Sequence, residues 1–257
     1  MIKSATCAAL VLLASTALAQ PGRDTVVVGP GVYRPAFPAS PEEREVAVSA
    51  FRLDRTPVTN AQFLAFVRAN PAWRRDGIKP LLADERYLAH WASPDSLGTA
   101  RPAAPVVRVS WFAARAYCAA HGGRLPLERE WELAAAASAT ARDATNDRAF
   151  QDRVLAWYTE LAPEILPDVG GPANVWGARD MHGLVWEWID DFSAALVDTD
   201  SRTPDRKVFC GGSGATSRDA AMYATFMRIA LRSSLEARST TVALGFRCAY
   251  DGKKASR

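Results

Sequence analysis

Few segments of this 257-residue chain show a regular hydrophobic period, and this feature most limits the folds available to it. Residues 71–105 carry Trp73, Trp91 and several prolines, but their apolar side chains recur at no fixed spacing, which is typical of irregular chain. We expect at most a short helix there, near 85–91. Folds that alternate strands and helices need periodic segments throughout. The sequence therefore favours the α+β class and argues against βαβ units.

Regular patterns are confined to short stretches, which predict a strand and three helices. Apolar and polar residues alternate over 46–53, as in a half-buried strand. Thr59 and Gln62 have the spacing of a capping box, so a helix should begin there. Ser110 is a suitable N-cap for a second helix. A third helix is expected after Pro126, with its apolar face turned inward.

The first residues have the composition of a secretion signal. Lys3 gives a basic start, 8–14 are all apolar, and small residues precede a cleavage position near Ala19. This apolar run is shorter than the ~20 residues of a spanning helix. We therefore predict a signal peptide over 1–19, no transmembrane segment, and a periplasmic or secreted location.

The rest of the chain divides into an arm and a domain. Residues 20–45 are rich in Pro, Gly and charge and should form an N-terminal arm laid over the core, whereas 46–257 should form one domain. The 31 basic and 28 acidic residues give a net charge of +3, and the basic residues form no long cluster. Nucleic-acid binding requires a basic stripe, so we expect no nucleic-acid partner.

Signal cleavage would leave Cys118, Cys210 and Cys248 in the mature chain. Two cysteines of an exported protein are normally joined, but counting alone does not decide which two. The third could be a metal ligand or a reactive nucleophile. The alternative for Cys210, beside two glycines, is a small buried apolar side chain.

Several blocks resemble the formylglycine-generating enzyme superfamily, also called sulfatase-modifying-factor domains. The blocks, which together cover nearly all of 46–250, are 51–54, 58–63, 105–111, 116–118, 124–126, 130–132, 174–177, 180–188, 211–213 and 244–248. The resemblance implies an elaborated C-type-lectin-like fold of the α+β class with little regular secondary structure. It also implies a disulfide between Cys118 and Cys248.

The resemblance further implies a structural calcium ion. The matching positions are the side chains of Asp180 and Glu187 and the carbonyl groups of Gly183 and Val185. Carboxylate and carbonyl oxygens are the ligands that calcium prefers. In the alternative interpretation, the two carboxylates cap turns and accept hydrogen bonds from backbone amides.

The chain departs from the superfamily where catalysis takes place. Formylglycine-generating enzymes bind copper(I) through two cysteines that lie in the stretch corresponding to 211–247, which contains no cysteine here. Counted back from Cys248, the two positions fall near Asp219 and Ala224. Neither side chain supplies the thiolate that copper(I) needs. We therefore expect no copper at the usual site and no formylglycine-generating oxidase activity.

Candidate catalytic residues in and near this stretch are Cys210, Arg228, Arg232 and Ser233. Arg228 and Arg232 are four residues apart, so on a helix they would share one face and could contact one carboxylate or anion. The alternative is a solvated basic face. The segment resembles the accessory proteins of copper nitrite reductase clusters, the NirV-type branch.

The leading hypothesis is an exported formylglycine-generating-enzyme-like protein that assists the maturation of a periplasmic enzyme, for instance a copper enzyme. One alternative is an oxidoreductase with a different site, as the siderophore-tailoring branch of the superfamily suggests. Another is a lectin-like binding module without chemistry. The expected partner is a periplasmic protein client or a small-molecule substrate.

Overall fold

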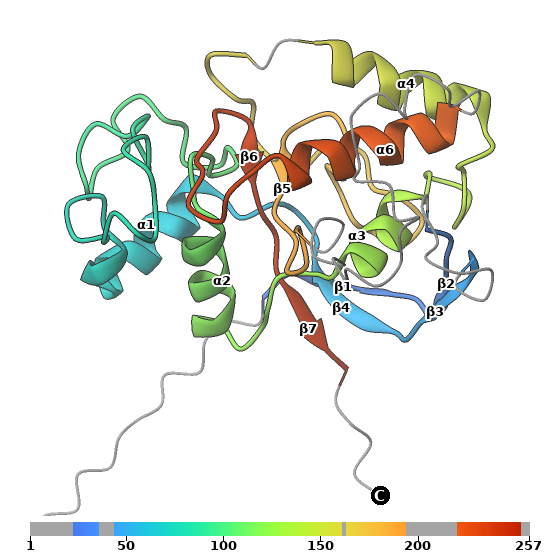
Figure 1. The fold of residues 1–257 in the computed structure, drawn as a ribbon, viewed down its shortest axis with the longest axis horizontal. Helices are drawn as coiled ribbons and strands as arrows, with labels where there is room; N and C mark the ends of the chain where they lie inside the picture. Colours follow the sequence, from blue (N-terminus) through green and yellow to red (C-terminus); the bar gives the residue numbers. More distant parts are fainter. Residues whose placement is uncertain (1–22, 36–43, 161–162, 194–219, 253–257) are drawn as a thin grey trace, which may run out of the picture.

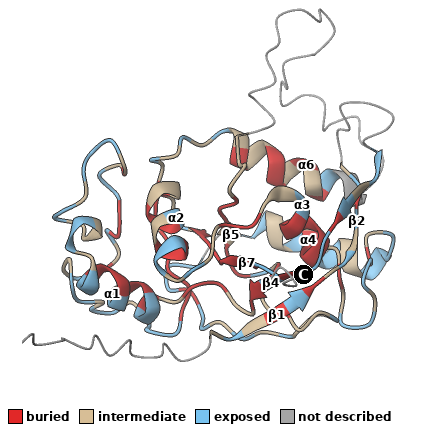
Figure 2. Ribbon diagram, turned by 90° about the horizontal axis from the view of Figure 1, so that it is seen from below, coloured by how far each residue is buried: buried red, intermediate tan, exposed pale blue. Residues whose placement is uncertain are grey.

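The computed structural model describes residues 23–35, 44–160, 163–193 and 220–252. In Figure 1 most of the short strands lie in the middle of the domain, whereas β2 (Gly31–Tyr33) and β3 (Val46–Val48) lie at its right-hand edge. Helices α1 (Asn60–Ala69) and α2 (Trp111–Ala120) lie to the left, and α3 (Glu128–Ala135), α4 (Arg148–Thr159) and α6 (Ala220–Ser233) lie to the right. Figure 2 shows that the buried residues gather where these elements meet. No helix within these ranges is long and apolar enough to cross a membrane.

The strands of the described residues form three small sheets. An antiparallel sheet has the order β1 (Thr25–Val28), β4 (Phe51–Asp54), β7 (Ala249–Asp251). The two other sheets are the antiparallel pair β2 (Gly31–Tyr33) and β3 (Val46–Val48) and the parallel pair β5 (Trp186–Glu187) and β6 (Leu244–Gly245). The strand expected over 46–53 is therefore two strands. The N-terminal arm contributes β1 and β2, so it is part of the sheets.

The three predicted helices are confirmed as α1 (Asn60–Ala69), α2 (Trp111–Ala120) and α3 (Glu128–Ala135). The capping box is present: Thr59 Oγ1 accepts from the Gln62 amide at 3.3 Å, and Gln62 Oε1 accepts from the Thr59 amide at 2.9 Å. A short 3-10 turn, η2 (Pro71–Trp73), follows α1. Local capping chemistry thus places the starts of α1 and α2 correctly.

Three segments differ from expectation. The chain over 85–91 forms turns and no helix, because Leu88 adopts a left-handed φ of 50° that a right-handed helix does not allow. Helix α4 (Arg148–Thr159) lies in a region for which the sequence predicts no helix, and Asp147 caps it by accepting from the Phe150 amide. The segment that begins at residue 220 forms α6 (Ala220–Ser233), a helix that carries both candidate arginines.

Aromatic side chains and one disulfide hold α1, α2 and the C-terminal strands together. Phe63 contacts Tyr117 and Phe246, with ring centroids 5.7 and 5.9 Å apart. Beside them Cys118 of α2 is joined to Cys248, which is fully buried. The bond links positions 130 residues apart, and it confirms the pairing that the superfamily resemblance implies.

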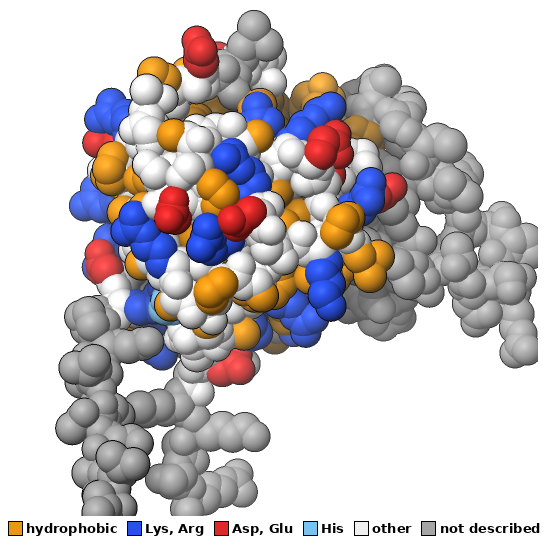
Figure 3. All heavy atoms as spheres, turned by 90° about the vertical axis from the view of Figure 1, so that its left-hand side faces the viewer, with side chains coloured by type: hydrophobic (Ala, Val, Ile, Leu, Met, Phe, Trp, Pro, Cys, Tyr) orange, Lys and Arg blue, Asp and Glu red, His pale blue; other side chains and the backbone are white. Residues whose placement is uncertain are grey.

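The surface shown in Figure 3 has no large area of one charge. Arginine and acidic side chains alternate on that face, with hydrophobic side chains between them. Several arginines of the described residues are paired with carboxylates at the surface, as Arg101 is with Asp168 at 2.7 Å. This pattern agrees with the absence of a basic stripe in the sequence.

Candidate functional site

A buried cluster of charges joins α3 to α6. The Glu132 carboxylate accepts from Arg228 Nε at 2.8 Å, and Arg232 Nη1 lies 3.4 Å from the same carboxylate. All three side chains are almost completely buried. The two arginines therefore share one face of α6 and converge on a carboxylate, as their spacing predicts, and the interpretation as a solvated basic face is wrong. The carboxylate belongs to the chain itself.

Aromatic rings enclose this cluster. The Arg232 guanidinium lies 4.7 Å from the centre of the Trp131 ring, and Arg228 donates a further hydrogen bond to the Tyr158 hydroxyl. Burial opposes ionisation of Glu132, but the adjacent arginines outweigh it, so the pKa of Glu132 is lowered. The pKa of Arg228 is raised by Glu132 against the effect of burial. The single Glu132 carboxylate is thus shared by two arginines, so the three side chains leave one positive charge in excess, and Glu132 already occupies the position where an external anion would bind both guanidinium groups.

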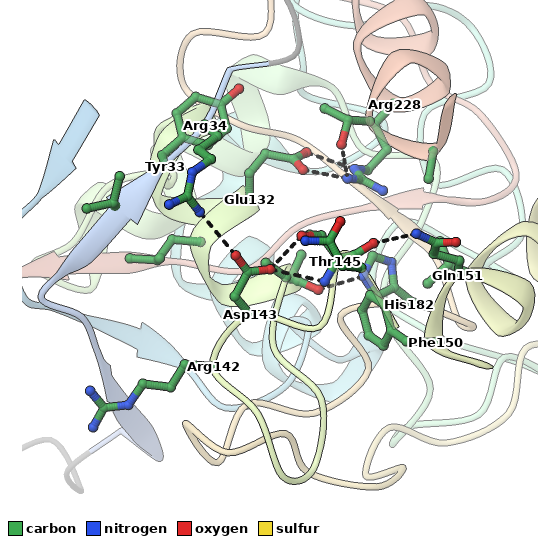
Figure 4. Close-up of a pocket in the computed structure, with 18 residues that line it drawn as sticks. Tyr33, Arg34, Glu132, Arg142, Asp143, Thr145, Phe150, Gln151, His182 and Arg228 are labelled. Carbon is green, nitrogen blue, oxygen red and sulfur yellow. Dashed lines mark hydrogen bonds and ion pairs between the residues drawn. The ribbon is translucent and has the colours of Figure 1, made fainter. Parts of the chain in front are cut away.

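A cavity of about 430 Å³ opens beside this cluster, between β2, α3, α4 and α6. Figure 4 shows Glu132 and Arg228 facing one another at its edge, and His182 beside Phe150 and Gln151. Ala224 of α6 also lines the cavity. A space of this size is in the range of small-molecule or side-chain binding pockets. The described residues therefore offer a binding site next to the rigid charge cluster.

His182 is held neutral in the wall of this cavity. Its Nε2 lies 2.9 Å from the Ala135 carbonyl oxygen and donates to it, so Nδ1 carries the lone pair. Burial, reinforced by Arg228, lowers the pKa of His182 to about 4. Nδ1 is buried and has no partner among the described residues. A neutral imidazole can accept or relay a proton, but it contributes no charge at pH 7.

The predicted calcium residues make other contacts. The Glu187 carboxylate accepts from Arg247 Nη2 at 2.8 Å and from the Trp131 indole at 2.7 Å, and both charged side chains are fully buried. Asp180, with a left-handed φ of 56°, accepts from the amides of Gly170 and Gly171 at 2.7 and 2.9 Å. Asp180 thus matches the alternative interpretation of a carboxylate that accepts from backbone amides, whereas Glu187 accepts from two side chains. Calcium binding at these residues stays a prediction.

The remaining calcium positions and candidate residues are placed as follows. Gly183 has a left-handed φ of 90° on an exposed turn, and Val185 is buried just before β5. No group of three or more His, Cys, Asp or Glu side chains that could hold a metal occurs within the described ranges. Ser233 ends α6, with its Oγ buried and unpaired among those residues. Cys210 and Asp219 lie outside the described residues.

Sequence reasoning missed Glu132 as the partner of the arginines and His182 as part of a cavity. The partner lies 96 residues before Arg228, so no local spacing reveals it. One signal was readable: Glu132 stands between Trp131 and Leu133 on a helix whose neighbours turn inward. A carboxylate at an inward position needs a cation from elsewhere in the chain.

Comparison with known proteins agrees with this architecture. The sequence matches the family described as "Sulfatase-modifying factor enzyme 1-like domain" over residues 12–252. The chain belongs to this family. It is an α+β member with few helices and small sheets, as the superfamily resemblance predicts.

Relatives in the sulfatase-modifying factor family carry different activities in their names. The chain is 30% identical to "Formylglycine-generating enzyme" of Streptomyces coelicolor, with 84% of this chain and 83% of the relative covered. It is also 30% identical to "Inactive C-alpha-formylglycine-generating enzyme 2" of Mus musculus, with coverage of 80% and 77%. "Hercynine oxygenase" of Mycolicibacterium thermoresistibile is 30% identical, with coverage of 68% and 46%.

Among solved structures, PvdO from Pseudomonas aeruginosa matches 88% of this chain and 94% of its own. The TM-score is 0.46 and the sequence identity 18%. Family membership therefore rests on the sequence matches, and the function of this chain has to be argued from its own site.

Proposed function

We propose that this chain is an exported accessory protein of the sulfatase-modifying factor family, which assists the maturation of a periplasmic enzyme such as a copper enzyme. It binds a segment of that client in the cavity between β2, α3, α4 and α6, and it does not oxidise thiols through copper.

The observation that carries this proposal is the identity of the residue on α6. Ala224 lines the cavity, and the superfamily resemblance places one of the two copper-binding cysteines of the oxidases near this residue. Of the four cysteines in the sequence, Cys118 and Cys248 are joined and Cys7 falls in the expected signal peptide. Copper(I) that oxidises a substrate thiol needs two protein thiolates close together. Cys210 alone does not meet this requirement.

The chemistry of the cavity supports binding. The Glu132–Arg228 pair is neutralised internally and enclosed by aromatic rings, so it acts as a rigid wall. Tyr33, Phe150 and the neutral His182 add apolar and uncharged polar surface. Arg34 and Asp143 of the same lining are paired at 3.3 Å, and the Arg142 guanidinium lies over the Trp176 ring. Such a mixed lining suits an apolar or polar side chain of a client. The relative named as inactive supports the idea that the fold persists in this family without oxidase activity.

The test uses the enzyme encoded beside the gene for this chain, produced in a periplasm with and without it. We expect the activity and metal content of that enzyme to fall several-fold without the chain. Val32→Trp, an exposed residue that lines the cavity, should give the same loss. Val27→Trp is the matched control, because Val27 is also an exposed valine on a short strand, β1, and does not line the cavity. Full client activity without the chain would refute the proposal.

A second candidate is a small-molecule oxidoreductase with a different site. The volume of the cavity, about 430 Å³, favours it, because a drug-sized molecule would fit. Oxygen consumption with thiol and phenol substrates separates the two functions. Consumption that Val32→Trp abolishes would favour the oxidoreductase and contradict a purely accessory role.

A further inference from the structure

A second cavity, separate from the first, has a volume of about 250 Å³. It lies between the segments 99–108 and 163–166 and is closed by Asn60, His90 and Val242. Two large apolar side chains at this cavity, Ile165 and Val242, are 60% and 52% exposed. The two side chains give this cavity an apolar surface that a ligand could cover.

Arg108 supplies the free charge of this cavity. No hydrogen bond or ion pair of its guanidinium occurs with any described residue, whereas Arg101, in the same lining, is paired with Asp168 at 2.7 Å. The backbone at Arg108 is fixed, because its amide donates to the Thr241 carbonyl at 3.0 Å and its carbonyl accepts from the Leu88 amide at 2.9 Å. These two hydrogen bonds hold Arg108 at a left-handed φ of 53°, which non-glycine residues rarely adopt. The position of an unpaired cation is thus built into the fold.

His90, which also lines this cavity, adds no charge to it. The Asn60 amide group donates to the Arg101 carbonyl at 3.0 Å, which orients its Oδ1 to accept from the Trp91 indole at 2.9 Å and from His90 Nε2 at 3.2 Å. Burial, reinforced by Arg108 and Arg75, lowers the pKa of His90 to about 4. The imidazole is neutral at pH 7.

The other charges near the cavity leave an excess of positive charge. Arg75 lies behind His90 and donates to the carbonyls of Leu88 and Trp91. Glu164 is the single acidic residue in the described lining, and it is exposed. With Arg101 neutralised by Asp168, Arg108 is left as the anion-binding group.

We propose that this cavity binds an α-carboxylate that carries an apolar side chain, with the carboxylate on Arg108 and the side chain between Ile165 and Val242. A guanidinium binds a carboxylate through two parallel N–H bonds, which suits a planar anion. The volume fits one residue. A peptide C-terminus and a free amino acid share this chemistry, and the site is independent of the client cavity.

The test is calorimetric titration of the full chain with three probes: acetyl-Gly-Gly-Leu with a free carboxylate, the same peptide as its amide, and free leucine. We expect the acid peptide to bind at least tenfold more tightly than the amide. Binding of leucine with equal affinity assigns the site to free amino acids, and binding of the peptide alone assigns it to C-termini; either result supports a carboxylate site.

Substitutions test whether Arg108 binds the carboxylate of the peptide. Arg108→Asn should weaken the acid peptide at least tenfold without lowering the melting temperature, since asparagine tolerates a left-handed φ. Arg108→Lys should retain part of the affinity. Arg153→Asn, an exposed arginine on α4, is the matched control, and Val32→Trp should bind normally, which separates this site from the client cavity. Equal binding of acid and amide, unchanged binding by Arg108→Asn, or no binding at millimolar peptide would overturn the proposal.

Discussion

Removal of the Arg228 charge tests how much the buried ion pair with Glu132 stabilises the fold. In Arg228→Met the Glu132 carboxylate stays buried and keeps only Arg232, at 3.4 Å. Breaking a buried ion pair by removing one partner costs about 3–5 kcal/mol, and we expect the lower end because Arg232 remains. For a domain of this size 1 kcal/mol corresponds to roughly 2–4 °C. The melting temperature should therefore fall by about 6–12 °C.

A double-mutant cycle assigns that loss to the pair. Glu132→Gln should also destabilise the fold, since it leaves both Arg228 and Arg232 without their carboxylate. The combination with Arg228→Met should cost clearly less than the sum, because it leaves one buried arginine without its partner and no longer two. Urea unfolding followed by fluorescence measures all four proteins. Arg148→Met is the matched control; Arg148 is exposed and paired with Asp152 four residues on, so its loss should stay near 0.5 kcal/mol or less. Additive losses, or a loss below about 1 kcal/mol in Arg228→Met, would show that this buried ion pair does not stabilise the fold.

Three further predictions concern pH, the disulfide and calcium. His90 and His182 have pKa values of about 4 in the fold, whereas in the unfolded chain they are protonated below ~6.5. The free energy of unfolding should therefore be highest above that pH and fall by up to about 3 kcal/mol for each histidine as the pH drops to 4. In His182→Gln the free energy of unfolding should depend less on pH. The double variant Cys118→Ala/Cys248→Ala should lower the free energy of unfolding by about 5 kcal/mol, because the disulfide closes a loop of 130 residues in the unfolded chain. Peptide mapping of the unreduced protein should find Cys118 linked to Cys248 and Cys210 free, and a link from Cys210 to either cysteine would contradict the assignment. Calcium at the positions that the superfamily resemblance implies should raise the melting temperature, and Glu187→Ala should remove this response. A melting curve that is unchanged after exhaustive chelation would contradict a structural calcium ion.

Local chemistry in the sequence predicts local structure here. Thr59 and Gln62 start α1, and the four-residue spacing of Arg228 and Arg232 places both on one face of α6. These features depend on neighbours within one helical turn. Asp147 carries the same kind of signal for α4, which a search for caps would have found.

Contacts between distant segments could not be predicted in the same way. Glu132 meets Arg228 across 96 residues, and His90 meets Asn60 across 30. The left-handed φ of Leu88 results from backbone contacts with a later segment, since its amide donates to Arg108. Periodicity contains no information on such pairings, so both cavities became visible only in the structure.

The proposed function requires that this member of the sulfatase-modifying factor family lack copper-dependent thiol oxidase activity. The most direct measurement is formylglycine formation in a Cys-x-Pro-x-Arg peptide, incubated with the chain, copper(I) and oxygen and analysed by mass spectrometry. Because one thiolate, Cys210, does not hold copper(I) beside a substrate thiolate, we predict no product above a blank with copper alone. Turnover above that blank, lost in Cys210→Ser, would contradict the account and make the chain an oxidase.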